Sequence, residues 1–300
     1  MNEPASTRTP LVSIVLTTLN GAPYLREAVG SCLNQTYQNL ELIVVDGGST
    51  DGTLDVLGEY TDPRLRVIHQ PNNAGQLPGA INLGLADAHG EYLTWMQADC
   101  IYEPDAVERM VSALEAHPEV GHVYADYWQI DELSNHLKVV RTCEPDEILQ
   151  AKSDPCGVCF MIRRALREAV GPHDVSTHPN HDSDYRWRIA LRFQSQHIPE
   201  PLYAWRLHAS SLSGTTPWYV LARNDVPIRQ RLGLLSAQQV GRELAAIDMA
   251  RAFECYQFGC FEQVPALVWA GLRRDPAFAR NRGVWAILFR SMQRTWMPHA

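Results

Sequence analysis

Two short apolar runs near the start of the chain have the pattern of buried strands. Residues 11–16 and 40–45 are rich in Val and Ile and have few polar positions. Runs of this kind are typical of parallel strands that helices cover on both faces of a sheet. Between them, residues 24–33 place their apolar side chains on one helical face. The pattern therefore predicts a strand–helix–strand unit, which is right-handed in nearly all proteins.

Similar patterns continue to residue 215 and predict an α/β domain. Further strands are expected at 65–69, 92–96, 120–130, 137–141, 156–163 and from 201, and helices at 54–60, 79–88, 105–117, 144–151, 164–170 and after 182. Residues 1–10 lack an apolar core and are expected to form a flexible tail rather than a signal peptide. From residue 216 the pattern predicts a C-terminal helical region, 216–300, with helices at 218–235, 237–258, 260–273 and 276–296.

Polar side chains follow the first two predicted strands. Thr18 and Asn20 come after the first strand, and Asp46 and Ser49 come after the second. The carboxyl ends of parallel strands meet at one edge of a sheet, where open α/β proteins bind their ligands. No glycine-rich phosphate loop with a following Lys is present. We therefore expect Asp46 to accept hydrogen bonds from a base or a ribose.

The composition narrows the class of protein. A formal net charge of −8 argues against broad nucleic-acid binding, which requires a basic face. No apolar stretch reaches about 18 residues, so no spanning helix is expected. We expect a cytoplasmic protein, either free or at the inner face of the membrane. The seven cysteines favour reduced core residues, although Cys156 and Cys159 have redox or metal spacing without a second pair.

Two longer motifs resemble a known family. The chain has Thr17-Thr18-Leu19-Asn20 and Val45-Asp46-Gly47-Gly48-Ser49-Thr50-Asp51-Gly52-Thr53. These strings resemble the start of family 2 glycosyltransferases, which are inverting enzymes, and the likeness continues more loosely to about Ser213. It implies the α/β GT-A fold, which is Rossmann-like with a mixed central sheet flanked by helices. It also implies a nucleotide-sugar half at 11–118 and an acceptor half at 119–215 within the catalytic domain, 11–215.

The resemblance also implies a divalent cation, Mg²⁺ or Mn²⁺, after the fourth predicted strand. The family has an Asp-x-Asp motif there, whereas this chain has Gln97-Ala98-Asp99-Cys100 with a single carboxylate, Asp99. Such a cation neutralises the leaving nucleoside diphosphate, and one carboxylate would hold it weakly without nucleotide. Gln97 is expected to bind ribose or donor sugar. The alternative is that Asp99 only caps the next helix.

Three more residues are expected at the nucleotide by resemblance. Asn82 lies in a stretch that borders the nucleotide and donor sugar in the family, although a local hydrogen bond in a helix is an equal alternative. Arg206 and His208 belong to a string like the family's Tyr-Arg-x-His-x-x-Ser-x-Ser ending. They are expected to face the diphosphate or the metal. The alternative for both is an edge strand in solvent.

A carboxylate near residue 180 carries the proposed chemistry. His181-Asp182-Ser183-Asp184 stands where the family has Glu-Asp-x-Asp, with His181 in place of Glu. An inverting transfer needs one base to take the proton of the acceptor hydroxyl. By resemblance that base is Asp182, which His181 could assist. From the residues alone, a helix N-cap is the favoured interpretation of Asp182.

The C-terminal region has one segment of ambiguous role. Residues 284–289 are apolar and have Arg282, Arg290 and Arg294 nearby. Such a segment suits peripheral contact with a membrane surface. Core packing, or packing against a second copy in a homodimer, explains it as well.

Together these features predict a glycosyltransferase of polysaccharide biosynthesis. It would move a sugar from a nucleoside diphosphate sugar, with UDP the commonest base in the family, to a hydroxyl of a glycan or a lipid-linked acceptor. One alternative is a catalytically impaired relative that only binds nucleotide or glycan, a reading to which Gln97 gives some weight. A nucleotidyltransferase is the other, and the missing phosphate loop argues against it.

Overall fold

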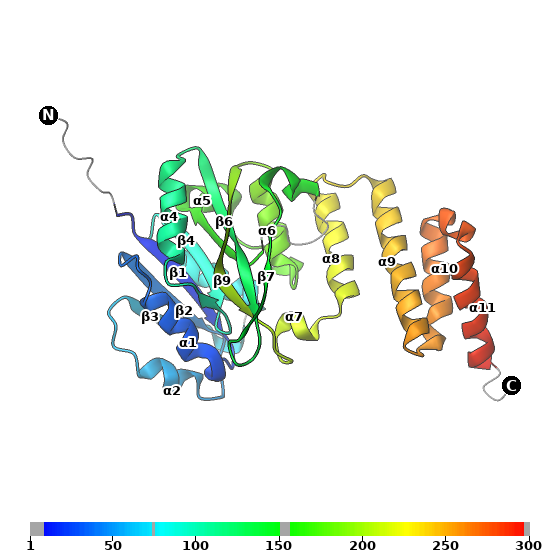
Figure 1. Cartoon of the computed structure of the whole chain (residues 1–300), viewed down its shortest axis with the longest axis horizontal. Helices are drawn as coiled ribbons and strands as arrows, with labels where there is room; N and C mark the ends of the chain where they lie inside the picture. The colour runs from blue at the N-terminus through cyan, green and yellow to red at the C-terminus, as the bar shows by residue number, and fades with distance from the viewer. Residues whose placement is uncertain (1–8, 74–75, 151–156, 297–300) are drawn as a thin grey trace. The chain divides into compact units, whose positions relative to one another are not determined.

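The computed structural model describes residues 9–73, 76–150 and 157–296. Residues 1–8 of the expected tail and Cys156 of the cysteine pair lie outside the described residues. The chain divides into two compact units, Met1–Thr215 and Thr216–Ala300 (Figure 1). Each unit has a hydrophobic core of its own.

The first unit is built on one mixed sheet with helices packed against it. The strands are Val12–Thr18 (β1), Leu40–Asp46 (β2), Leu65–His69 (β3), Tyr92–Gln97 (β4), Ile101–Tyr102 (β5), Val120–Ile130 (β6), His136–Val140 (β7), Cys159–Arg163 (β8) and Gln194–Arg206 (β9). The α-helices are Ala22–Leu33 (α1), Thr53–Gly58 (α2), Gln76–Asp87 (α3), Ala106–Ala116 (α4), Arg164–Val170 (α5), His181–Ala190 (α6) and Leu212–Thr215 (α7). The strand order is β3-β2-β1-β4-β8-β6-β9-β5, and β7 pairs with β6.

The first four strands are parallel and confirm the predicted strand–helix–strand start. Every residue of β1 and β2 is buried, which explains their nearly continuous apolar runs. The helix α3 lies so close to the sheet that a Cβ on Gly84 would come within 3.0 Å of the Val45 side chain. Glycine at this position therefore allows α3 to pack directly on β1 and β2.

The second half of the sheet differs from the sequence prediction in two strands. β9 begins at Gln194, whereas the sequence placed its start at residue 201. Pro199 and Pro201 break the strand pattern, but the structure places them where the β6–β9 register shifts between Ala125 and Asp126. A shift of this kind accommodates residues that cannot donate to the ladder. The two-residue strand β5 is too short to leave a periodic signal.

Two other predicted elements in this half are shorter or tighter than expected. β8 begins at Cys159 rather than at residue 156, because Gly157 has a φ of 64° and does not extend the strand. The helix expected at 144–151 is a 3₁₀ turn, Pro145–Gln150. β8 runs antiparallel to both of its neighbours, β4 and β6, so the sheet is mixed as predicted.

The second unit consists of helices, as predicted. They are Trp218–Arg231 (α8), Ala237–Gln257 (α9), Val264–Arg274 (α10) and Arg282–Trp296 (α11), drawn from yellow to red in Figure 1. Its core includes Met249, Ala252, Val268 and Ile287. In the part of the chain that the structure describes, no helix has the length and apolar character needed to cross a membrane.

Candidate active site

A cavity of about 580 Å³ opens beside the carboxyl ends of β1 and β4. Its lining includes five of the predicted site residues: Thr18, Asn20, Gln97, Asp99 and His208. Residues of α3 and of the segment after β9 complete the wall. This edge of an open α/β sheet is the usual place for a ligand.

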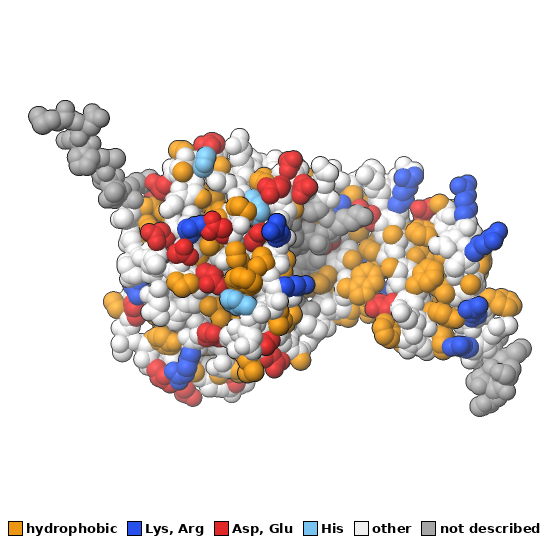
Figure 2. All heavy atoms as spheres, in the orientation of Figure 1, with side chains coloured by type: hydrophobic (Ala, Val, Ile, Leu, Met, Phe, Trp, Pro, Cys, Tyr) orange, Lys and Arg blue, Asp and Glu red, His pale blue; other side chains and the backbone are white. Residues whose placement is uncertain are grey.

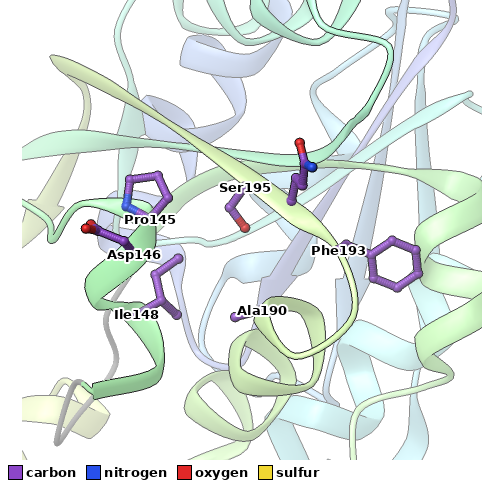
Figure 3. A pocket seen from close by; sticks show the side chains of 7 residues that line it. Pro145, Asp146, Ile148, Ala190, Phe193 and Ser195 are labelled. Carbon is purple, nitrogen blue, oxygen red and sulfur yellow. The ribbon is translucent and has the colours of Figure 1, made fainter.

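A smaller cavity of about 330 Å³ lies between the 3₁₀ turn after β7 and the start of β9 (Figure 3). Its lining combines Pro145, Ile148, Ala190 and Phe193 with the polar residues Asp146, Gln194 and Ser195. It includes none of the site residues that the sequence predicts. The cavity at β1 and β4 is therefore the candidate active site.

The carboxylate of Asp99 and the ring of His208 meet at the wall of this cavity. Asp99 Oδ2 lies 2.9 Å from His208 Nε2, and His208 Nδ1 lies 2.9 Å from Ser210 Oγ. The imidazole also packs at a tilt against the ring of Tyr24, with 5.0 Å between the centroids. Asp99 does not cap α4, because the N-cap of that helix is Asp105. The structure thus joins two predicted metal ligands that are far apart in the sequence.

The Asp99–His208 pair is the candidate metal site. Asp99 Oδ2 and His208 Nε2 are 2.9 Å apart, at hydrogen-bonding distance, and both atoms are of kinds that bind divalent cations. Among the residues described here, no group of three or more His, Cys, Asp or Glu side chains forms a metal site. Cys100 is buried and is not part of the cavity lining.

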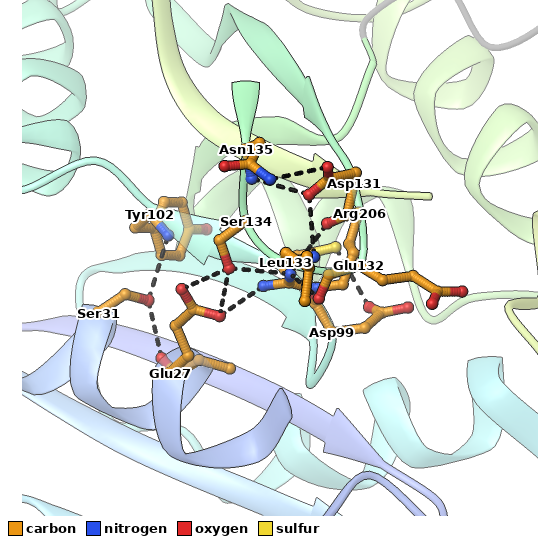
Figure 4. A network of polar contacts seen from close by, with 12 residues as sticks. Glu27, Ser31, Asp99, Tyr102, Asp131, Glu132, Leu133, Ser134, Asn135 and Arg206 are labelled. Atoms are coloured by element: carbon orange, nitrogen blue, oxygen red, sulfur yellow. Dashed lines mark hydrogen bonds and ion pairs between the residues drawn. The ribbon is translucent and has the colours of Figure 1, made fainter. Parts of the chain in front are cut away.

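Arg206 is not part of the cavity lining, and it lies next to the backbone of Asp99 (Figure 4). Its Nε donates to the main-chain oxygen of Asp99 at 2.9 Å, and its Nη1 donates to the oxygens of Asp131 and Glu132 at 3.1 and 3.2 Å. Its Nη2 donates to Glu27 on α1 at 2.5 Å. The guanidinium is fully buried.

This arrangement does not support the expectation that Arg206 binds diphosphate directly. Its donors already bind main-chain oxygens of the Asp99 loop and of the loop between β6 and β7, and it also stacks over Tyr24 at 4.6 Å. The alternative of a solvent-exposed edge residue does not hold either, because Arg206 is buried. Arg206 instead fixes the backbone on which Asp99 stands.

Asp46 and Ser49 build the turn after β2. The carboxylate of Asp46 accepts hydrogen bonds from the amides of Gly48 and Ser49 and, at 2.5 Å, from Ser49 Oγ. Asn20, in the left-handed region at φ 53°, accepts a bond from the Thr50 amide at 2.8 Å and donates its own amide to Ser49 Oγ at 2.8 Å. These bonds tie the two loops that follow β1 and β2. Neither Asp46 nor Ser49 is part of the cavity lining.

Thr18 and Asn82 differ in whether their polar side-chain atoms have hydrogen-bond partners. The hydroxyl of Thr18 is buried at the cavity and has no hydrogen-bond partner among the described residues. Such an atom is available to a ligand. The amide of Asn82 is fully engaged, since it donates to the His173 carbonyl at 2.9 Å and accepts from the His173 amide at 2.8 Å. Asn82 therefore ties α3 to the segment before α6 and does not line the cavity.

Asp182 stands in the first turn of α6, close to the cavity wall formed by His178. It is not the N-cap, which is Asn180. Its side chain is 27% exposed, and its Oδ1 makes no hydrogen bond within the described part of the chain and lies 3.5 Å from His181 Nε2. Asp182 is not itself part of the cavity lining. The carboxylate is thus uncommitted and partly open.

A cluster of three imidazole rings meets this carboxylate through His181. The rings of His173 and His178 each lie 5.7 Å from that of His181. Burial lowers the pKa of His173 well below its usual value and also lowers the pKa of His178, with the charge of His181 as the next cause in both. His173 and His178 are therefore neutral near pH 7. The ring nearest to Asp182 is that of His181, whose Nε2 lies 3.5 Å from Oδ1.

Sequence reasoning missed three residues of this region. Tyr24 and Glu27 come from α1, where they look like ordinary helix-surface positions, and they meet Arg206 and His208 only through the fold. His178 lines the cavity and precedes the Asp182 motif by a few positions. Its proximity to that motif was the one signal available.

Sequence comparison finds relatives over most of the chain. A family model described as glycosyl transferase family 2 matches residues 13–171. An uncharacterized glycosyltransferase of Rickettsia typhi is 33% identical over 223 residues, which is 70% of this chain and 68% of that protein. Glycosyltransferase GlyG of Streptococcus pneumoniae is 36% identical over 124 residues, 41% of this chain and 40% of that protein.

Solved structures share the fold at low sequence identity. S. aureus TarS 1–349 in complex with UDP-GlcNAc matches with a TM-score of 0.63 and 15% identity, covering 96% of this chain and 92% of that chain. The mannosyltransferase PcManGT from Pyrobaculum calidifontis, in complex with GDP-Man and Mn²⁺, matches with a TM-score of 0.59 and 20% identity, covering 99% and 90%. These likenesses establish the GT-A fold that the sequence predicted.

Proposed function

The chain is a glycosyltransferase that belongs to glycosyl transferase family 2, and we propose that it transfers a sugar, with inversion, from a nucleoside diphosphate sugar to a hydroxyl group. The donor is a UDP-sugar, and the acceptor is a glycan or a lipid-linked glycan. The observation that carries the proposal is the Asp99–His208 pair, 2.9 Å apart, on the wall of a cavity at the carboxyl ends of β1 and β4.

In this proposal the cavity holds the donor. Thr18, Asn20 and Gln97 face it with a hydroxyl and two amides, which suit a nucleoside and a sugar. Asp99 and His208 hold Mg²⁺ or Mn²⁺, which neutralises the charge that develops on the leaving diphosphate. Asp46, Ser49, Asn82 and Arg206 keep their neighbouring loops in place and act on the donor through them.

Asp182 is the proposed general base. Inversion in one displacement requires a group that accepts the proton of the acceptor hydroxyl as its oxygen attacks the anomeric carbon. The Asp182 side chain is 27% exposed, and its buried Oδ1 makes no hydrogen bond among the described residues and lies 3.5 Å from His181 Nε2, so the exposed part of the carboxylate can meet an acceptor hydroxyl. The N-terminal end of α6 favours the ionised carboxylate.

The first experiment measures thermal stabilisation by UDP, GDP, dTDP and CDP, each with and without Mn²⁺. A ligand at about a hundred times its dissociation constant stabilises a protein by about 2.7 kcal/mol. We expect a shift with UDP that Mn²⁺ increases. Asp99→Ala should lose the metal-dependent part, whereas Asp105→Ala, a matched loss of one exposed carboxylate at the start of α4, should keep it. If no nucleotide shifts the transition, the chain does not bind a nucleoside diphosphate sugar and the proposal fails.

A second experiment separates binding from chemistry. Asp182→Asn should keep the nucleotide-induced shift and slow turnover of the donor by about a hundredfold to ten-thousandfold, the usual contribution of a general base. Turnover is measured as release of UDP from the donor that the first experiment identifies. Unchanged turnover in Asp182→Asn would assign the base to another residue.

A further inference from the structure

The two units of the chain carry opposite charge. Residues 216–300 contain eleven arginines, no lysine and six acidic residues, whereas the whole chain has a formal net charge of −8. The C-terminal unit is therefore basic, at about +5, and the first unit is strongly acidic. On the face that Figure 2 shows, blue side chains lie among orange ones over the C-terminal unit, with few red ones.

The positive charge is concentrated on the last two helices. Residues 264–296 hold six arginines and one acid, Asp275, whose carboxylate accepts a bond from the Ala277 amide at 3.0 Å. Arg274 is paired with the buried Asp248 on α9. Within the described residues, Arg273, Arg280, Arg282 and Arg290 make no ion pair and are exposed. Their charge is available to a partner.

A stripe of exposed apolar side chains runs between these arginines. α11 buries Val284, Ile287 and Leu288 in the core of the unit. Its outer side exposes Trp285 (42%), Phe289 (65%) and Met292 (40%), which recur at helical spacing. The sequence left core packing and surface contact as alternatives for this segment, and the structure shows that α11 divides its apolar residues between the core and the outside.

A second helix extends the stripe. Trp269 of α10 is 46% exposed and meets Trp285 edge to face, with 6.2 Å between the ring centroids. Trp285 Nε1 donates to the Ala279 carbonyl at 2.7 Å, so the indole has a fixed orientation. Arg273 stands one helical turn after Trp269, and Arg290 stands next to Phe289. The exposed aromatic rings of α10 and α11 therefore each have an arginine within one helical turn along the sequence.

We propose that this face of α10 and α11 binds the surface of an anionic lipid membrane. Aromatic rings enter the boundary between headgroups and acyl chains, while arginines bind the lipid phosphates. Indole and guanidinium are the groups best suited to this boundary, because each combines an apolar or weakly hydrated body with hydrogen-bond donors. The acidic first unit is repelled by such a surface, which leaves the basic unit as the part that attaches. The inference does not depend on the proposed function.

The test is co-sedimentation of the full chain with vesicles. Vesicles of equal parts phosphatidylglycerol and phosphatidylcholine are compared with vesicles of phosphatidylcholine alone, at low salt and at about 0.5 M salt, where surface charges are screened. We expect binding to the anionic vesicles only, weakened by salt. Arg273→Gln with Arg290→Gln should lower the partition coefficient about 25-fold, at about fivefold for each arginine. Phe289→Ser should lower it about tenfold.

Matched control variants test whether vesicle binding depends on this surface rather than on the net charge or the general hydrophobicity of the chain. Arg109→Gln with Arg141→Gln makes the same change in charge on the first unit, and Leu137→Ser removes an exposed apolar side chain from β7. Both should bind vesicles as the unaltered chain does, and circular dichroism should show that all variants are folded. No binding to anionic vesicles would overturn the proposal. So would equal losses in the control variants, or a dimer that Phe289→Ser dissociates without any binding to vesicles.

Discussion

Replacing the buried Arg206 by Met separates its structural role from direct contact with diphosphate. The guanidinium donates to the main-chain oxygens of Asp99, Asp131 and Glu132. It also donates to the carboxylate of Glu27. Met has a similar length but no donors, so three oxygens would lose a charged partner. At about 1 kcal/mol or slightly more for each oxygen, this costs about 3–4 kcal/mol. The half-exposed Glu27 adds little, and the lost stacking on Tyr24 adds about 0.5 kcal/mol.

The assay for Arg206→Met is urea unfolding at pH 7 together with nucleotide titration. We expect the free energy of unfolding to fall by about 4 kcal/mol and the melting temperature by about 10 °C. Metal-dependent nucleotide binding should weaken as well, because the Asp99 loop loses its anchor. Arg206→Lys keeps the charge but not the fork of donors, and it should recover only part of the stability. If Arg206→Met leaves the unfolding free energy within about 1 kcal/mol and weakens only nucleotide binding, Arg206 contacts the diphosphate directly.

Three further perturbations test the packing and the titration of the fold. Gly84→Val should lower the free energy of unfolding by about 3 kcal/mol or more, since its side chain would collide with Val15 and Val45, and urea unfolding measures the loss. The pKa of His122 is lowered to about 3, chiefly by burial and secondly by the Arg186 charge. Below about pH 6.5 the unfolded chain therefore binds a proton that the folded chain does not, and this costs about 2 kcal/mol of stability at pH 5. His122→Gln should reduce the difference in unfolding free energy between pH 7 and pH 5 by that amount, and an unchanged difference would assign the pH dependence to other groups. Ser236→Ala breaks the capping box of α9 and should lower the free energy of unfolding, measured in urea, by about 1 kcal/mol. An unchanged free energy of unfolding would indicate that the first turn of α9 is frayed.

The fold of the first unit was predictable where local patterns decide the structure. The buried strands β1 and β2 left continuous apolar runs, and α1 left a periodic apolar face. β9 and β5 were misjudged because their pairing depends on distant partners. Pro199 and Pro201 disrupt the local strand pattern of β9, yet its pairing with β6 continues across a register shift.

The candidate site was also predictable only in part, because residue types are local to the sequence whereas contacts between them are not. The residue types at Thr18, Asp99, Asp182 and His208 were readable from motifs, because each follows a strand or begins a helix. The motifs did not show which of these side chains contact one another. Asp99 and His208 stand 109 positions apart, and their side chains come within 2.9 Å only because β4 and β9 end at the same side of the sheet.

The sequence by itself determined most of the elements, the family resemblance and a set of candidate residues for the site. Only the tertiary structure decided which polar groups remain available to a ligand. Arg206 and Asn82 have the right chemistry for a nucleotide, but distant main-chain groups already take up their hydrogen bonds. Thr18 and Asp182 keep an atom without a partner among the described residues. The physical reason is that a buried polar group must be satisfied by whatever the fold brings to it, and those partners come from other parts of the chain.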